Sequence, residues 1–290
     1  MTQSTKQLQK ASLWTRKFAS GLCPCDSGRF AKECCYTKDN YWKKDPSDII
    51  LQGEPTGFSH QKCIFMPHKN CSTKISKEHY FSRSILEQFD WNTATLDGFP
   101  WITKNGNKPS INSMTANILC ERHNNALSHL DNSAGDVFRE LKLIGNWKNT
   151  REFYITSGAD FERWMLKTLC GTIAAKLIKE NVNIINTYEI KNQWLDILVG
   201  NENFSGTMGL YIEGGIGQEF GFEDKFSFSP LFNDSNRKQV IGASFIMAGL
   251  MFHLIMENNA SHIPEHWRNP FRTLVFNLPN KRKRGILFSW

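Results

Sequence analysis

Residues 118–131, ILCERHNNALSHLD, put a cysteine, a histidine and an asparagine at the start of a helical pattern. The apolar positions Leu119, Leu127 and Leu130 have the spacing of a strand end that turns into a short helix. Residues 75–86, ISKEHYFSRSIL, place an acid and a histidine side by side before an apolar run. The fold of this part of the chain depends on what brings the two stretches together.

A second group of metal-ligand residues provides the connection. Cys120 and His123 form a C-x-x-H pair, and Cys63 and Cys71 lie upstream in the stretch CIFMPHKNC. Three thiolates and one imidazole are a usual ligand set for structural zinc. The gap of seven residues between the upstream cysteines is long for a zinc knuckle, so His68 is an alternative to Cys71 and a degenerate, empty site stays open. We expect zinc here, with Cys71 as the better fourth ligand.

Zinc at this position would bring Glu78, His79 and Asn124 close together, and these residue types suit phosphodiester hydrolysis. A histidine, with an ordinary pKa of about 6.5, can take a proton from water at neutral pH. A hard cation such as Mg²⁺ binds carboxylate and amide oxygens and keeps positions open for substrate. Without the C-x-x-H-N sequence, the Glu-His pair would be more typical of a surface ion pair.

These stretches resemble the HNH endonuclease family, in particular its zinc-stapled members. Their pattern is an acid–histidine pair, a middle asparagine, and C-x-x-C followed at once by histidine or asparagine. The resemblance implies a ββα-metal fold in which Glu78 and Asn124 hold a catalytic Mg²⁺ or Mn²⁺ ion and His79 is the general base. It puts His123 where the second knuckle cysteine is usual, and either Asn112 or Asn117 at the middle position.

The sequence departs from that family pattern at several points. Glutamate stands at the first position in place of the commoner aspartate or histidine, and the knuckle is irregular. An inactive, structural ββα fold is therefore the alternative. Arg83, four residues after the proposed base, could clamp the scissile phosphate through its planar guanidinium, although an exposed arginine near a turn is equally compatible.

The N-terminal stretch CPCDSGRFAKECC, residues 23–35, contains four cysteines. Four thiolates at this spacing suit one tetrahedral zinc ion, and the turn residues between the pairs let the chain fold back. The ligands would be Cys23, Cys25, Cys34 and Cys35. The stretch resembles the SEC-C motif, a small zinc module, with Asp26 where glycine is common. That resemblance implies a docking unit for protein or nucleic acid, and a stabilising unit without a partner is the alternative.

Composition favours a folded protein and only weakly an anionic partner. The chain has 290 residues, 40% of them hydrophobic, and a formal net charge of +7. We expect it to be cytoplasmic, because it shows no signal peptide and clustered cysteines without an export signal favour metal sites over disulfides. The most apolar stretch, residues 240–256, is interrupted by glycines and a histidine, and predicts buried strands or a core helix instead of a membrane span.

The sequence predicts an α+β protein with three units. Residues 1–45 form the four-cysteine zinc module with a basic N-terminal segment, residues 58–150 the HNH-like ββα-metal module, and residues 151–290 a mixed α/β domain of unknown role. Residues 46–58, with two prolines and two glycines, read as a linker. In the last unit, residues 157–180 have the spacing of an amphipathic helix, and several later runs read as strands.

Two functions follow as expectations. The first is a metal-dependent HNH endonuclease that hydrolyses phosphodiester bonds in a nucleic acid, with DNA favoured as substrate. The second is a non-enzymatic zinc-binding adaptor, in which the four-cysteine module docks a protein or nucleic-acid partner and the HNH-like fold is structural. Replacing His79 distinguishes them, because only the nuclease depends on this side chain for activity.

Overall fold

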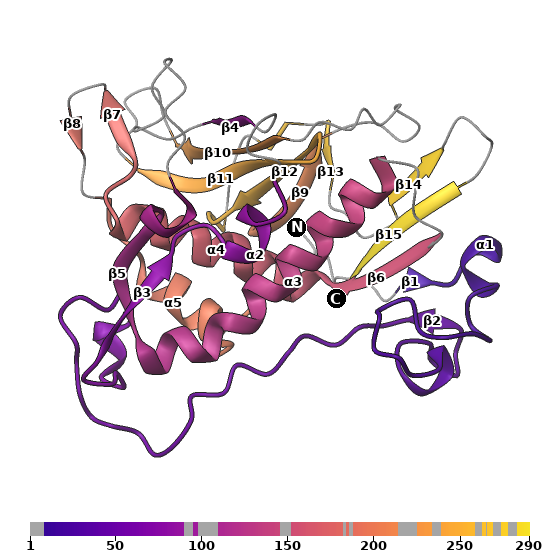
Figure 1. Cartoon of the computed structure of the whole chain (residues 1–290), viewed down its shortest axis with the longest axis horizontal. Coiled ribbons are helices and arrows are strands. Elements are labelled where there is room, and N and C mark those ends of the chain that lie inside the picture. The colour runs from indigo at the N-terminus through magenta and orange to yellow at the C-terminus, as the bar shows by residue number, and fades with distance from the viewer. Residues whose placement is uncertain are drawn as a thin grey trace.

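The computed structural model shows a mixed α+β architecture (Figure 1). It describes residues 9–89, 95–97, 110–145, 152–181, 184–185, 188–213, 225–233, 239–258, 263–264, 266–268, 274–277 and 283–290. Most of the basic segment expected at the N-terminus, residues 1–8, lies outside these ranges. Within them, no helix is long and apolar enough to cross a membrane.

A ββα unit is formed by the two stretches that the sequence analysis singled out. Strand β3 (Ile75–His79) pairs antiparallel with β5 (Thr115–Cys120), with a register shift between Ser76 and Glu78. Helix α3 (Glu121–Gly145) begins directly after β5. The short helix α2 (Arg83–Leu86) follows β3 and packs on α3. The strand pair and the helix therefore meet at Cys120, the first residue of the C-x-x-H sequence.

Helix α4 (Gly158–Ala174) lies at the centre of the molecule (Figure 1). The hydroxyl oxygen of Ser157 caps its N-terminus by accepting a hydrogen bond from the backbone N–H of Asp160. Gly158 and every residue from Asp160 to Ile173 are buried. The sequence predicts an amphipathic helix here, but α4 has no exposed face, because α3, α5 (Asn192–Val199) and two sheets surround it.

The larger of these sheets has six strands in the order β13-β9-β12-β11-β10-β4. Its strands are β4 (Thr95–Asp97), β9 (Gly209–Glu213), β10 (Lys225–Phe232), β11 (Val240–Met247), β12 (Leu250–Ile255) and β13 (Trp267–Arg268). The most apolar stretch of the chain forms the β11–β12 hairpin, so the expectation of buried strands is confirmed. Ala248 and Gly249 connect the two strands with φ angles of 51° and 92°, which suits a two-residue hairpin turn.

The smaller sheet carries the N-terminal cysteine module. Its strand order is β14-β15-β6, made of β6 (Phe153–Ser157), β14 (Leu274–Asn277) and β15 (Lys283–Ser289). The N-terminal module contains β1 (Gln9–Lys10), α1 (Leu13–Arg16), a 3-10 helix (Ala31–Glu33) and β2 (Tyr41–Trp42). Trp42 of the module is buried against Phe153, with ring centroids 5.3 Å apart. The module thus shares a small apolar core with the sheet.

The expected linker, residues 46–58, is an extended segment that is fixed to the rest of the protein. The backbone N–H and the hydroxyl of Ser47 both donate to the carboxylate of Asp160, each at 3.1 Å. Farther along, the Arg122 guanidinium donates to the backbone carbonyls of residues 51–53. In Figure 1 this segment runs along the lower edge of the molecule from β2 towards the ββα unit. Its composition predicted a loop, and its attachments come from residues far away in sequence.

One apolar core extends across position 150, where the sequence analysis placed a domain boundary. Phe81, between β3 and α2, packs edge-on against Phe226 and Phe228 of β10. The indole N–H of Trp164 in α4 donates to the Ser82 hydroxyl at 2.6 Å. The ββα unit is therefore packed directly on the C-terminal half. The remaining described elements are short: 3-10 helices Met66–His68 and Ile111–Ser113, and the strand pair β7 (Lys179–Asn181) and β8 (Ile184–Ile185).

Candidate functional site

The second cysteine group forms a closed cluster where the ββα unit begins. The ligand atoms of Cys63, Cys71, Cys120 and His123 all lie within 4.8 Å of one another, and the four residues are buried. The Cys120 sulfur lies 3.1 Å from His123 Nδ1, and the Cys63 sulfur 3.8 Å from the same nitrogen. These separations fit the edges of a tetrahedron with zinc–ligand bonds of about 2.0–2.3 Å. The cluster could hold a metal ion such as zinc.

The surroundings of this cluster also suit bound metal. The backbone N–H of Cys120 donates to the Cys63 sulfur at 3.4 Å, and that of Ser72 donates to the Cys120 sulfur at 3.3 Å. Such donors stabilise thiolates. Burial lowers the pKa of His123 to about 4, so its imidazole is neutral and can bind metal at pH 7. His68, the alternative ligand, lies outside the cluster and faces Asp196 at 3.4 Å.

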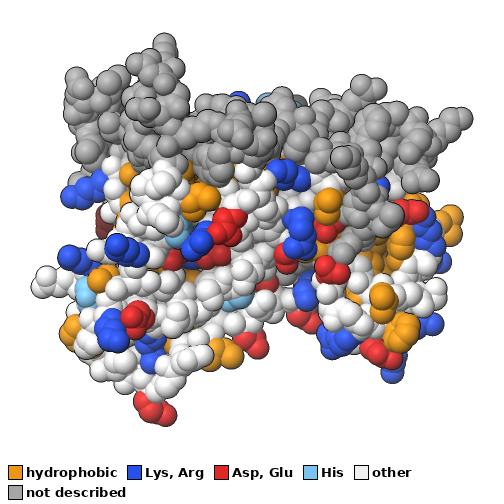
Figure 2. Space-filling model, viewed as in Figure 1, with side chains coloured by type: hydrophobic (Ala, Val, Ile, Leu, Met, Phe, Trp, Pro, Cys, Tyr) orange, Lys and Arg blue, Asp and Glu red, His pale blue; other side chains and the backbone are white. Residues whose placement is uncertain are grey.

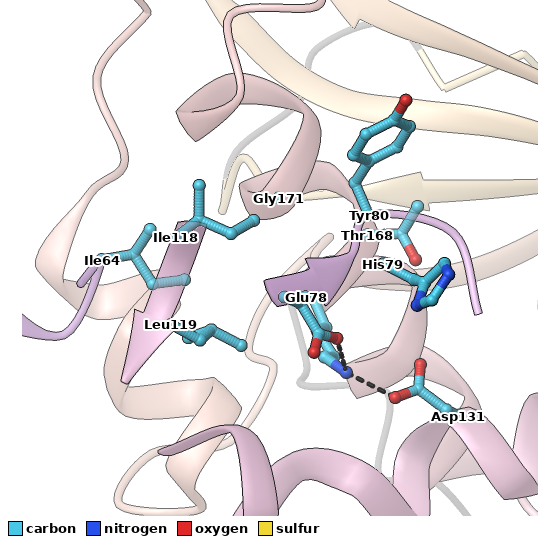
Figure 3. A pocket seen from close by; sticks show the side chains of 10 residues that line it. Ile64, Glu78, His79, Tyr80, Ile118, Leu119, Asp131, Thr168 and Gly171 are labelled. Atoms are coloured by element: carbon cyan, nitrogen blue, oxygen red, sulfur yellow. Dashed lines mark hydrogen bonds and ion pairs between the residues drawn. The ribbon is translucent and has the colours of Figure 1, made fainter. Parts of the chain in front are cut away.

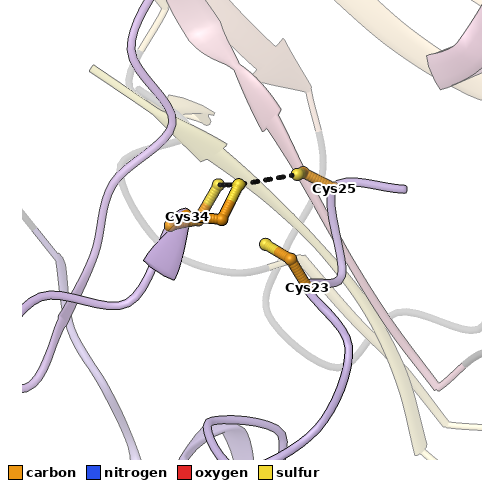
Figure 4. Close-up of side chains that lie close together, drawn as sticks. Cys23, Cys25 and Cys34 are labelled. Carbon is orange, nitrogen blue, oxygen red and sulfur yellow. Dashed lines mark hydrogen bonds between the residues drawn. The ribbon is translucent and has the colours of Figure 1, made fainter. Parts of the chain in front are cut away.

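The N-terminal cysteines form a second cluster with the same compactness. The sulfur atoms of Cys23, Cys25, Cys34 and Cys35 lie within 4.8 Å of one another, and Figure 4 shows Cys23, Cys25 and Cys34 converging from two segments of the chain. The Cys25 and Cys34 sulfurs are 3.5 Å apart. Asp26 has a φ of 66°, a left-handed conformation that favours glycine. This cluster could hold zinc as well.

A small pocket lies at the end of β3, between the ββα unit and α4 (Figure 3). Its polar lining comes from Glu78 and His79 of β3, Asp131 of α3, and Lys167 and Thr168 of α4. Its apolar lining is Ile64, Tyr80, Ile118, Leu119 and Gly171. The acid and histidine of the EH pair thus reach the same pocket, together with a second carboxylate two helical turns beyond Asn124.

A lysine joins the two carboxylates of this pocket. The ammonium of Lys167 lies 2.5 Å from Glu78 Oε1 and 2.5 Å from Asp131 Oδ2, and its side chain is only 5% exposed. Burial by itself lowers the pKa of Lys167, but the charges of Asp131 and Glu78 outweigh it and leave this pKa above the usual lysine value. Burial raises the pKa of Glu78, and the lysine charge opposes that rise. The ammonium is therefore charged at neutral pH.

His79 has the properties of a base in this pocket. Burial, and next the positive charge of Arg83, lower the pKa of its imidazole below the usual histidine value. The neutral form therefore predominates at pH 7. The buried Nε2 atom has no hydrogen-bond partner among the described residues, and the backbone carbonyl of Ile111 acts on the ring from the other side. The backbone contact to the imidazole therefore comes from Ile111, the residue before Asn112, while Asn117 is exposed on β5.

The other two expected site residues do not line the pocket. The amide of Asn124 donates to the Ser76 hydroxyl at 2.9 Å. Ser76 lies two residues before Glu78 on β3. Arg83 is exposed and its guanidinium pairs with Glu87 at 2.6 Å. Its charge still acts on His79. The structure therefore brings Glu78 and His79 together with Asp131, and leaves Asn124 two turns earlier on α3.

Lys167 was missed as a site residue in the sequence, and the position of Asp131 was more typical of a helix-end contact than of a ligand, although each residue had a signal. Asp131 lies seven residues after Asn124, on the same face of a helix. Lys167 is the one charge in WMLKTLC, residues 164–170, and a lysine inside an apolar helical stretch needs a buried partner. The sequence gives no indication of which carboxylates that partner would be.

Charged side chains on the face seen in Figure 2 are interspersed. Among the described residues of this face, lysine and arginine lie between aspartate and glutamate, and no single large basic surface is seen. The formal net charge of +7 is therefore not concentrated on that face. Comparison with known proteins adds no identification, because no family model, no curated protein and no solved structure matches this chain.

Proposed function

We propose that this protein is a metal-dependent endonuclease that hydrolyses phosphodiester bonds, with DNA as the first substrate to test. The observation that carries the proposal is the pocket at the end of β3. There a neutral histidine with an unpartnered Nε2 lies beside two carboxylates, on a ββα unit whose strands and helix converge on a cysteine–histidine cluster. The resemblance to zinc-stapled HNH endonucleases supports the same reading.

The carboxylates fit a divalent cation. Oxygen atoms of Glu78 and Asp131 already converge on one positive charge, that of Lys167. Mg²⁺ and Mn²⁺ prefer such oxygen ligands and need only one or two of them from protein. A cation held here would stabilise the charge that develops on the scissile phosphate and its leaving oxygen. Since Asn124 is bonded to Ser76, we propose Glu78 and Asp131 as the cation's ligands.

His79 performs the proton transfer in this proposal. Its Nε2 accepts a proton from the attacking water, and the lowered pKa keeps this nitrogen unprotonated at pH 7. The Ile111 carbonyl holds the other side of the ring. Arg83, which is exposed next to the pocket, is available to bind a backbone phosphate of the substrate.

Cleavage of supercoiled plasmid by the full-length protein tests this function. Wild-type protein is expected to nick the plasmid with Mg²⁺ or Mn²⁺ and not with EDTA, and His79→Ala to lose the activity while keeping its zinc content. His266→Ala is the matched control, because that side chain is 61% exposed on another part of the molecule. Equal activity in wild type and His79→Ala, or none on any DNA or RNA substrate, contradicts the proposal.

A docking role for the N-terminal module is the second candidate, and one observation favours it. Leu22 and Phe30 pair in a β-bridge beside the cysteine cluster, yet they are 65% and 56% exposed. Adjacent exposed apolar side chains on a small zinc module are typical of a protein-binding surface. Replacing both with serine would abolish partner binding and leave cleavage unchanged, whereas a purely structural module predicts no change in either.

A further inference from the structure

Lys167 belongs to a helix outside the ββα unit, yet it reaches the centre of the candidate site. It projects from α4, while Glu78 is on β3 and Asp131 on α3. The dashed lines in Figure 3 run from the two carboxylates to the nitrogen between them. One ammonium group thus contacts the two residues that, under the proposed function, bind the divalent cation.

The remaining bonds of Asp131 leave one oxygen for a cation. Its Oδ1 accepts a hydrogen bond from the Ser82 hydroxyl at 2.5 Å, and Ser82 accepts one from Trp164. Its Oδ2 faces Lys167. On Glu78, Oε1 faces the same ammonium. Glu78 Oε1 and Asp131 Oδ2 are therefore the two oxygens that face a common positive charge, and both contact Lys167.

A lysine ammonium and a divalent cation cannot both occupy this place. Each of them needs the same two oxygens at close range, and like charges at such a distance repel strongly in a buried site. Lys167 has a flexible stem of four carbons, so its ammonium can move while α4 stays in place. A phosphodiester bound at the mouth of the pocket would offer the displaced ammonium a new negative partner.

We propose that Lys167 is a built-in competitor of the divalent cation at Glu78 and Asp131, and that its displaced ammonium pairs with the substrate phosphate. This inference rests on the proposed function. The charges at the site cancel when the two carboxylates and the lysine are joined by a divalent cation and one phosphodiester. Without substrate, the cation and the lysine together leave an excess positive charge. Cation binding is therefore weak in the free protein and strengthened by nucleic acid.

Direct binding of Mn²⁺ to the zinc-loaded, full-length protein tests the competition, read by electron paramagnetic resonance. Lys167→Met is expected to bind Mn²⁺ at least about tenfold more tightly than wild type, because one charge is removed at contact distance. Lys77→Met is the matched control, since Lys77 precedes Glu78 but is exposed. Lys167→Gln, which keeps two N–H donors, is used if the methionine variant does not fold.

The outcomes separate this inference from the proposed function. Equal Mn²⁺ affinity in the Lys167 and Lys77 variants overturns the competition and leaves the nuclease standing. Tighter binding that is lost on adding Glu78→Gln supports the competition even if no nucleic acid is cleaved. In an active enzyme, Lys167→Met also lowers both the Mn²⁺ concentration at half-maximal rate and kcat. A merely structural lysine would not change the metal requirement.

Discussion

Lys167 Nζ and Asp131 Oδ2 lie 2.5 Å apart, and this contact joins the two longest described helices of the protein. The same nitrogen contacts Glu78 on β3. A single side chain therefore connects the ββα unit to the centre of the C-terminal half. The candidate site is built at the junction of these two parts.

The buried pair of Lys167 and Glu78 is expected to be energetically coupled. Lys167→Met leaves two carboxylates without their partner and should lower the free energy of unfolding by about 3–5 kcal/mol. Because Glu78→Gln removes one of these charges, the double variant should lose less than the sum of the two single losses. Urea denaturation of the four proteins measures the difference. Additive losses would show that the two groups do not interact.

The two cysteine clusters are expected to hold one zinc ion each. Elemental analysis of purified protein should give two zinc ions per chain, and Cys120→Ser should reduce this to one and lower the thermal midpoint, because its cluster joins the loop that carries Cys63 and Cys71 to β5 and α3. Cys170→Ala is the control, since Cys170 is buried in α4 and belongs to neither cluster. Two zinc ions in Cys120→Ser would place the second ion elsewhere.

Substitutions of Asp131 and Asn124 are expected to have different effects on metal-dependent cleavage. Asp131→Asn should reduce Mg²⁺-dependent cleavage about 10–100-fold, as expected for loss of a metal ligand, and raise the Mg²⁺ concentration needed. Asn124→Ala should change the rate little, because that amide is bonded to Ser76. Rates measured over a Mg²⁺ titration distinguish the two. The reverse order would restore Asn124 as the ligand that the HNH resemblance implies.

Buried His253 on β12 is expected to make stability depend on pH. Burial lowers the pKa of His253 to about 4, although the charge of Glu213 on β9 opposes this shift. His266 also faces Glu213. The Ser244 hydroxyl on β11 is hydrogen-bonded to Nδ1 of His253 at 2.7 Å. Because the unfolded chain takes up a proton near pH 6.5 and the folded chain does not, stability falls between pH 6.5 and 4. At pH 5.5 the loss is about 1 kcal/mol.

The variant His253→Gln isolates this contribution. Its free energy of unfolding, measured by urea denaturation at pH 8 and pH 5.5, should fall less with acid than that of wild type. Titrating groups that do not interact with His253 act equally on both proteins and cancel in the comparison. The same pH slope in wild type and variant would show that His253 takes up its proton in the folded state.

The sequence could predict the parts of the fold that depend on neighbouring residues. Apolar spacing after Cys120 places the start of α3, and apolar runs bounded by glycine place β11 and β12. The two ligand clusters could be predicted for the same reason, since few patterns other than metal binding bring four cysteine or histidine residues into such short segments. The pairing of β3 with β5 follows once the ligands are joined.

What the sequence could not predict depends on contacts between distant segments. Glu162, Arg163 and Lys167 on α4 look like the polar face of an amphipathic helix, but each is buried and bonded. Glu162 accepts from the backbone N–H of Leu210 at 2.8 Å, and Arg163 donates to the carbonyl of Ile197 at 3.1 Å. Only the tertiary arrangement shows that these charges are internal, and that one of them reaches the candidate site.

The extended segment 46–58 has a consequence for the use of the N-terminal module. Its two fixed points, Ser47 on Asp160 and residues 51–53 on Arg122, prevent it from acting as a tether of variable length. A macromolecule captured at Leu22 and Phe30 would therefore be presented to the β3 pocket in one orientation. The module would hold its partner at a set distance from that pocket without taking part in cleavage.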